Sequence, residues 1–136
     1  MDIDAGLRVV REQHHGILAT RRRDGSPQMS PVAVGVDAAN KVVVSTRETA
    51  MKAKNLMRDP QASVCVFADS FYGPWVQLDG TAEVVHLPEA LDGLVDYYRG
   101  ISGEHPDWDD YRAAMQRERR VLVRITVTRA GPDHSG

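Results

Sequence analysis

The chain has 136 residues, 42% of them hydrophobic and 26% charged, which is the composition of an ordinary globular domain with one hydrophobic core. Its formal net charge of −2 argues against general nucleic-acid binding, which usually requires a basic surface. Cys65 is the only cysteine, so neither an internal disulfide nor a cysteine cluster for zinc is possible, and a reducing cytoplasm is expected.

The N-terminal segment predicts an amphipathic helix. Ile3, Leu7 and Val10 recur at helical spacing, and the segment has no apolar core of the kind that signal peptides carry. Glycine often follows a helix, so we expect this helix to end near residues 14–16, His-His-Gly. No stretch approaches the ~18 apolar residues of a membrane span. We therefore expect a soluble protein that contacts no membrane.

Six strands are predicted from apolar runs that are bounded by turn signals. The first two lie within residues 17–36 and form a hairpin, because Asp24-Gly25 is a strong turn signal. Pro27 and Pro31 lack backbone donors, which places the second strand at a sheet edge. The other four strands are expected at residues 41–46, 62–68, 75–87 and 120–127.

Three further helices are expected between these strands. The stretch TRETAMKAKNL, residues 46–56, predicts a strand end that turns into a two-turn helix, which Asp59-Pro60 terminates. A helix beginning at Pro88 and another carrying Trp108, Tyr111 and Met115 follow. Because the strands come in runs joined by hairpins, we predict one α+β, mainly β domain over residues 1–136, a six-stranded antiparallel barrel with peripheral helices.

The same stretch, 46–56, concentrates positive charge at a helix start. Arg47, Lys52 and Lys54 lie where the helix dipole disfavours cations. One interpretation is a solvated helix, since exposed charges are the norm. The other is a phosphate site, because free N–H groups at a helix start and the hydroxyls of residues 45, 46 and 49 suit an anion. Lys52 is nearer the helix start and is the better phosphate ligand, since Lys54 points roughly 200° away.

Other candidate sites in the sequence are weaker. His14 and His15 are adjacent and point in different directions, so they make a poor metal pair. The acidic segment 104–110 lacks the spacing of a calcium loop or a zinc motif, and no Ser-His-Asp set is readable. Cys65 lies in the apolar run ASVCVF and is expected to be an inert core thiol. No metal site and no catalytic side chain is predicted, so a cofactor would carry any chemistry.

Four segments resemble one known family. GILATRRRDGSPQMSPV, VVVSTRETAMKAKNLMRDPQASVCV and WVQLDGTAEV are similar to the pyridoxamine-phosphate-oxidase-like split-barrel flavoproteins. The segment YRGISGEHPDWDDYRAAMQRERRVLVRI resembles the deazaflavin branch of that family, the small reductases of actinobacteria that use coenzyme F420. The resemblance covers nearly the whole chain and implies a split β-barrel of the FMN-binding type.

The resemblance also implies a cofactor site in a groove between the two barrels of a homodimer, with Lys52 on the cofactor phosphate. The implied cofactor-binding residues are Ser30, Pro31, Val32, Ser45, Thr46, Arg47, Ala50, Met51, Lys52, Trp75, Gln77 and Arg120. One departure concerns the phosphate, because some relatives carry arginine at the position of Ala50, whereas this chain has Arg47.

The activity that the resemblance implies is hydride transfer from reduced F420 to an electron-poor organic acceptor, a small molecule such as an enone. Two alternatives stay open. One is an FMN-binding oxidoreductase of the same family, and the other is a carrier that binds the coenzyme without turnover. A second basic cluster for a substrate phosphate is not found in the sequence, which argues against pyridoxamine phosphate as the substrate.

Overall fold

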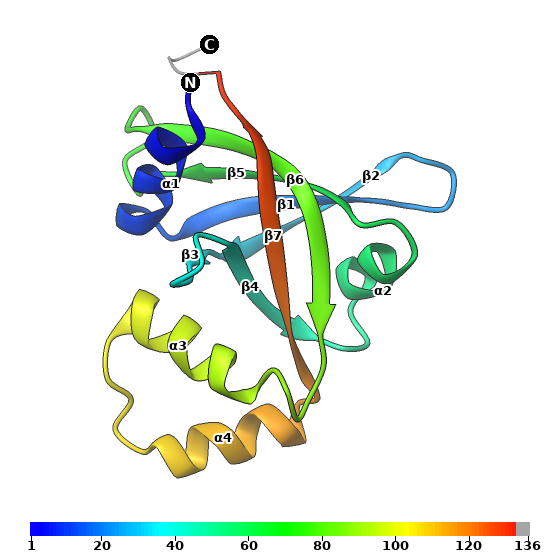
Figure 1. Ribbon diagram of the computed structural model, residues 1–136, viewed down its shortest axis with the longest axis vertical. Helices are drawn as coiled ribbons and strands as arrows, with labels where there is room; N and C mark the ends of the chain where they lie inside the picture. The colour runs from blue at the N-terminus through cyan, green and yellow to red at the C-terminus, as the bar shows by residue number, and fades with distance from the viewer. Residues whose placement is uncertain (133–136) are drawn as a thin grey trace.

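A computed structural model, which describes residues 1–132, folds the chain around one curled antiparallel sheet (Figure 1). The sheet has seven strands in the order β2-β1-β5-β6-β7-β4-β3. The strands are β1 (His15–Arg21), β2 (Pro27–Ala33), β3 (Gly35–Val36), β4 (Val42–Arg47), β5 (Gln61–Phe67), β6 (Trp75–Val85) and β7 (Arg120–Ala130). The predicted class, a mainly β, antiparallel split barrel with peripheral helices, is confirmed.

Two local predictions about the N-terminal third are wrong. The predicted second strand is divided into β2 and β3 at Val34, whose N–H donates to the carbonyl of His14 at 2.8 Å instead of continuing the ladder. The first helix, α1 (Ile3–Glu12), ends before the histidines, and His15 already pairs with Phe67 of β5. Sheet pairing therefore overrides the helix signal of the glycine at position 16.

The inner face of the sheet holds the main hydrophobic core. Its strand residues include Leu18, Val44, Val64, Leu78 and Ile125, all fully buried. Burial of each such side chain contributes about 1.5–3 kcal/mol to stability. The helices α1 and α2 (Met51–Arg58) add residues to this core from two separate ends of the curled sheet (Figure 1).

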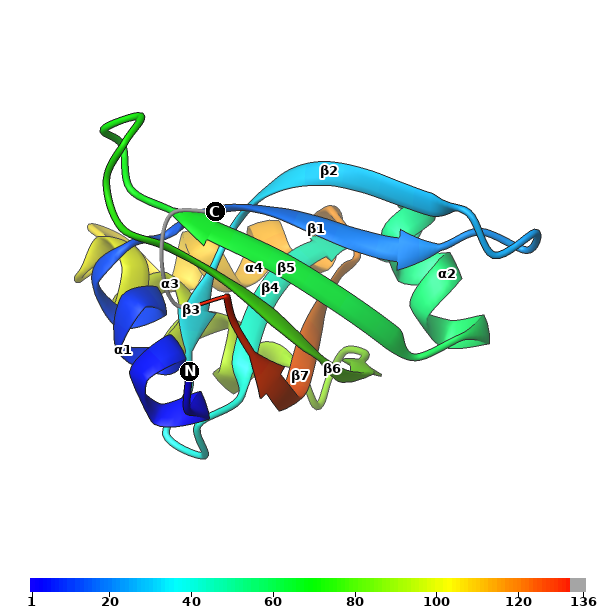
Figure 2. The same cartoon turned by 90° about the horizontal axis from the view of Figure 1, so that it is seen from above.

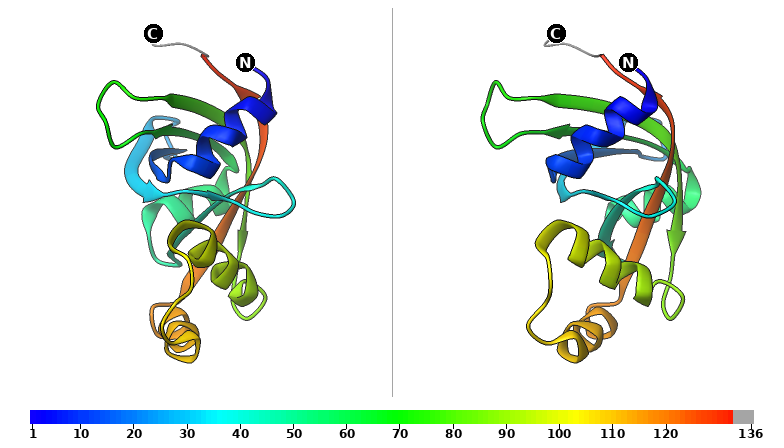
Figure 3. Two further views of the ribbon diagram at one scale, coloured as in Figure 1. Left: turned by 90° about the vertical axis from the view of Figure 1, so that its left-hand side faces the viewer. Right: turned by 60° about the vertical axis from the view of Figure 1, so that its left-hand side comes forward.

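A second core lies outside the sheet, under the helices α3 (Leu91–Ser102) and α4 (Trp108–Arg117). The two helices pack together against β4 and β7 (Figure 3). Val43 and Leu122 face Leu94 and Tyr111 there, because alternate residues of a strand point to opposite faces. We call this part of the outer sheet surface the covered half.

The remaining outer surface, over β2, β1, β5 and the start of β6, is covered by no helix of residues 1–132 (Figure 2). We call it the bare half. Pro31, Ile17, Cys65 and Gln77 form one cross-strand row along it. The expectation that Cys65 is a core thiol is therefore wrong, since Val64 and Val66 point inward and the residue between them must point outward.

No helix within residues 1–132 combines the length and the apolar character that crossing a membrane requires. In the same residues, no three His, Cys, Asp or Glu side chains are gathered in a way that would hold a metal ion.

Candidate cofactor site

The start of α2 places one lysine in a half-buried position without an acidic partner. Ala50 precedes the helix in an extended conformation, and no side chain caps the free N–H groups of the first turn. Lys52 follows in that turn, and its Nζ donates to Ser30 Oγ on β2 at 3.1 Å. No carboxylate of residues 1–132 lies within ion-pair distance of Lys52.

The electrostatic environment of Lys52 is unfavourable to its charge. Burial lowers the pKa of its ammonium group, and the neighbouring positive charge of Arg120 lowers the pKa further. A buried cation that lacks a counter-charge destabilises the folded protein. An anion bound beside Lys52 and Arg120 would remove this penalty and form charge-assisted hydrogen bonds, which are about twice as strong as neutral ones.

Two arginines extend this site along the ends of β4 and β7. Arg47 and Arg120 are direct partners in the β4–β7 ladder. Both point to Glu118, with nitrogen–oxygen distances of 3.5 Å from Arg47 and 2.8 Å from Arg120. The hydrogen bond from Arg120 holds the pKa of the Glu118 carboxyl below its usual range, so that it is ionised at neutral pH. We call Lys52, Arg47 and Arg120 the cation cluster.

Tyr97 of α3 lies beside the cation cluster and contacts both β2 and β4. Its hydroxyl donates to the carbonyl of Ala33 at the end of β2, at 2.8 Å. Burial raises the pKa of Tyr97, while the backbone N–H of Ser45 and the charge of Arg120 act in the opposite direction. Ser45 and Arg120 therefore lie close to this phenol, in the region where β2 approaches β4.

The structure divides the remaining predicted cofactor residues among three positions. Thr46 is buried and shares the inner face of β4 with Val44, and Val32 packs against the main core. Met51 is exposed at the start of α2. A third set lies on the bare half, away from Lys52, and consists of Pro31, Trp75 and Gln77. One chain therefore does not bring the predicted residues into a single pocket.

Three residues near the site are not singled out by the sequence. Tyr97 lies beside Tyr98, and nothing in the local pattern distinguishes the two. Glu118 sits in a run of charged residues that looks uniformly solvated. Arg58 donates to Asn55 and to the carbonyl of Arg21, and so holds α2 against β1.

The two adjacent histidines diverge, as expected of a poor metal pair. The Nδ1 of His14 lies 2.8 Å from the carbonyl of Val34, and that of His15 lies 2.7 Å from Asp69. Burial raises the pKa of the Cys65 thiol, which leaves it protonated and weakly nucleophilic at neutral pH.

This arrangement agrees with a comparison with known families. The family model described as pyridoxamine 5'-phosphate oxidase matches residues 4–132. The chain belongs to this family. Known structures share its split-barrel fold, and the family contains oxidoreductases.

Three solved structures illustrate the similarity. A conserved hypothetical protein from Mycobacterium tuberculosis is 29% identical, with a TM-score of 0.76 over 96% of this chain and 82% of that one. An F420 reductase is 20% identical, with a TM-score of 0.69 over 91% of this chain and 94% of that one. A heme-binding protein from Mycobacterium smegmatis is 21% identical, with a TM-score of 0.70 over 96% of this chain and 53% of that one.

Proposed function

We propose that the protein is an F420-dependent oxidoreductase that reduces an electron-poor organic acceptor. The observation that carries the proposal is Lys52, a half-buried cation beside Arg120 with a hydroxyl partner on Ser30 and no acidic partner among residues 1–132. This donor set fits the phosphate of a cofactor. The resemblance of segment 98–125 to the deazaflavin branch and the similarity to an F420 reductase support F420 as that cofactor.

Each part of the site has a specific task in this proposal. The uncapped first turn of α2 presents its N–H groups to the phosphate, and Lys52 donates from the side. Arg120 and Arg47 supply further positive charge along the anionic tail. Ser45 lies where β2 comes close to β4, and its hydroxyl forms a hydrogen bond with the ring of the cofactor or with the polar chain attached to that ring.

When bound, reduced F420 supplies the hydride. The protein contributes position, because two reacting planes held at roughly 3–3.5 Å react far faster than free molecules. The phenol of Tyr97 donates its hydrogen bond to the carbonyl of Ala33 and so holds β2 against α3. Because burial raises its pKa, the phenol stays protonated and takes no proton from the substrate. Water or a backbone group supplies the proton.

The bare half supplies the second part of the site in this proposal, from a second copy of the chain. Met29 and Phe67 are 63% and 37% exposed beside the row that contains Pro31 and Gln77. Apolar patches of this kind mark protein interfaces. A homodimer that buries the bare half would bring Trp75 and Gln77 of one copy toward the cation cluster of the other.

An FMN-dependent oxidoreductase is the second candidate, favoured by the family's description as an oxidase and by a phosphate site that fits FMN as well. A carrier without turnover is the remaining alternative.

The absorption spectrum of the purified protein, followed by titration with F420, FMN and haem, separates these cases. We expect tight binding of F420 and its oxidation in the presence of an enone. Tight FMN retention would favour the second candidate, and binding without oxidation across a broad acceptor panel would favour the carrier.

The contribution of Lys52 is tested with a matched pair of variants. Lys52→Ala removes a charged hydrogen bond and should weaken cofactor binding by about 1–3 kcal/mol, which is about 5-fold to 150-fold. Lys54→Ala removes the same charge from an exposed position in the same helix and should leave binding nearly unchanged. Equal effects of the two variants would show that the site responds only to the general charge of α2, and the phosphate assignment would be rejected.

A further inference from the structure

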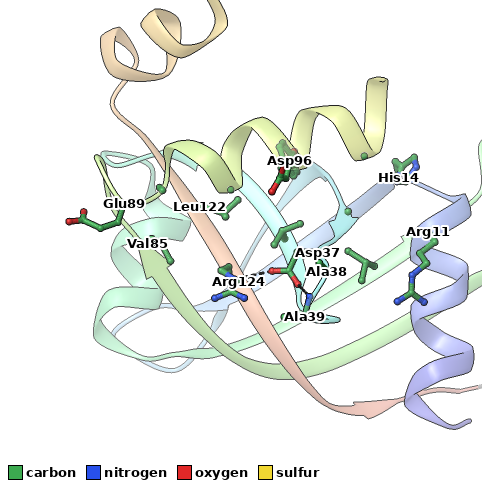
Figure 4. A pocket seen from close by; sticks show the side chains of 17 residues that line it. Arg11, His14, Asp37, Ala38, Ala39, Val85, Glu89, Asp96, Leu122 and Arg124 are labelled. Atoms are coloured by element: carbon green, nitrogen blue, oxygen red, sulfur yellow. Dashed lines mark hydrogen bonds and ion pairs between the residues drawn. The ribbon is translucent and has the colours of Figure 1, made fainter. Parts of the chain in front are cut away.

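The covered half contains a cavity that the proposed cofactor site does not use. It has a volume of about 680 Å³ and lies between α3 and the outer face of β4, β6 and β7 (Figure 4). Sites for small organic ligands usually have volumes in this range. Tyr97 lines both this cavity and the candidate cofactor site, but no member of the cation cluster lines the cavity, and neither Ser30 nor Ser45 does. The cavity is therefore next to the cofactor site and has a largely different lining.

Two glycines of α3 line the cavity, and they have different surroundings. Gly93 and Gly100 are two helical turns apart and so share one face of α3. A Cβ atom at Gly93 would lie 2.7 Å from Leu122 Cδ2, whereas a Cβ atom at Gly100 would meet nothing within 4 Å. Gly93 therefore allows α3 to approach Leu122 closely, whereas Gly100 leaves open space beside the helix, although each glycine inside a helix costs about 1 kcal/mol relative to alanine.

The lining combines an apolar floor with positive and polar groups at one end. Val43, Val85 and Leu122 form the floor. Arg11 and His14 lie together at one end of the cavity, where α1 meets β1 (Figure 4).

Arg11 and His14 both have hydrogen-bonding capacity left for a ligand. Arg11 donates to the side-chain oxygen of Asn40 at 2.7 Å and forms no ion pair with residues 1–132. The Nδ1 of His14 faces the carbonyl of Val34, which can only accept, so this nitrogen carries a hydrogen and Nε2 remains for another partner.

The other charged groups of the lining are already paired or point elsewhere. Arg124 binds Asp37 at 3.0 Å and Glu83 at 2.8 Å, so its charge is neutralised by the protein itself. Asp96 lies 3.6 Å from Arg99 on its own helix. Glu89 is at the end opposite Arg11, with its carboxylate directed away from the centre of the cavity (Figure 4). Arg11 is thus the charge that the lining offers to a ligand.

We propose that this cavity binds a small organic acid. The apolar body of the acid lies on Val43, Val85 and Leu122, and its carboxylate accepts hydrogen bonds from Arg11. His14 lies at the same end, and its unprotonated Nε2 can accept a hydrogen bond from a donor group of the ligand other than the carboxylate. The site belongs to a single chain and does not depend on the identity of the cofactor.

The test uses 4-phenylbutyrate and its uncharged amide as probes of equal shape, titrated into the full-length protein by calorimetry. We expect the acid to bind more tightly than the amide. Arg11→Gln should weaken binding of the acid about tenfold or more and leave the amide unchanged, since a charge-assisted bond is lost. Arg8→Gln removes an arginine of the same helix that does not line the cavity, and should change neither.

A second pair of variants tests the location. Gly100→Leu places a side chain in open space and favours helix formation, so the protein should fold and lose both probes. Ser102→Leu adds the same side chain to the same helix outside the cavity and should keep both. Lys52→Ala should also keep both, which separates this site from the cofactor site. Failure of the native protein to bind the acid at millimolar concentration, or retention of binding by folded Gly100→Leu, would overturn the proposal.

Discussion

The two halves of the outer sheet surface belong to one continuous sheet but consist of different strands, and only one of them is covered by helices. The covered half is overlaid by α3 and α4, and Leu94, in the core beneath them, has no solvent exposure. The bare half has the same alternation of residues, yet its outward side chains stay in contact with solvent and include Met29 and Phe67. The chain therefore completes one half of its outer surface by itself and leaves the other half to a partner of similar apolar character.

The cation cluster lies where these two halves meet. β2 belongs to the bare half and β4 to the covered half, and the curl of the sheet brings β2, an edge strand, close to β4, the next-to-last strand at the other side. Two side chains join them: Lys52 bonds to Ser30 of β2, and Tyr97 reaches from α3 to Ala33. A ligand held at this junction contacts elements of both halves, which explains why its binding residues are scattered along the sequence.

The largest expected effect is a difference in how much a substitution in each half lowers the free energy of unfolding. Leu94→Ala should lower the free energy of unfolding by about 2–5 kcal/mol, because it opens a void in a core that the chain seals itself. Denaturant titrations should give the same loss at every protein concentration. Met29→Ala in the bare half should cost less, and its cost should grow with protein concentration if a second copy covers this residue. A concentration-independent loss for Met29→Ala would argue against the interface.

The next effect concerns assembly. Met29→Asp places a charge in the bare half and should weaken dimerisation at least tenfold, because an unpaired buried charge is costly. Sedimentation should then show a species with the chain mass of 15.1 kDa. Met57→Asp is the matched control, since Met57 is similarly exposed but lies on α2 away from the sheet face. Dissociation by both variants would indicate general destabilisation and no specific interface.

Much of the fold follows from local patterns in the sequence. Asp24-Gly25 fixes the first hairpin because Gly25 adopts a positive φ of 84°, and Asp59-Pro60 ends α2 as expected. The apolar runs predict β4, β5, β6 and β7 within a few residues. The errors occur where a long-range contact decides the local structure, as with the pairing of His15 with Phe67.

The candidate site was less predictable, for the same reason. Lys52 could be selected because its position in a helix turn is a local property. Its contacts with Ser30 and Arg120 depend on how the sheet curls, and the facing direction of Cys65 depends on strand register. The size of the cavity beside Gly93 and Gly100 depends on the distance between α3 and the sheet, and no pattern in the sequence predicts that distance.

A pH titration sharpens the role of Lys52 at the junction. Its pKa is lowered in the free protein, so above that pKa the ammonium loses its proton and with it the attraction for a phosphate. A bound dianion favours the charged form and raises the pKa again, so binding takes up a proton in this range. Affinity for the cofactor should therefore fall as the pH rises through the lowered pKa of Lys52 toward 10.5.

Lys52→Arg provides the control for this titration. Arginine stays charged throughout, so the alkaline decline in affinity should disappear even if the altered geometry weakens binding at neutral pH. Fluorescence titrations of F420 at a series of pH values measure both proteins. An identical alkaline decline in the variant would assign the effect to another group.

The smallest expected effect tests whether Glu118 competes with the ligand. Its carboxylate is ionised and holds Arg120 and Arg47, so part of the positive charge of the cluster is neutralised by the protein. Glu118→Gln should tighten cofactor binding by about twofold to fivefold, since exposed charge pairs are worth about 0.2–1 kcal/mol. The gain should shrink at high salt, because exposed charges are screened.

Glu104→Gln is the control: it removes the partner of Arg99 on the far side of α3 and should leave binding unchanged. If Glu118→Gln weakens binding instead, the carboxylate serves to position Arg120, and the cluster binds its anion as an ordered network that includes Glu118.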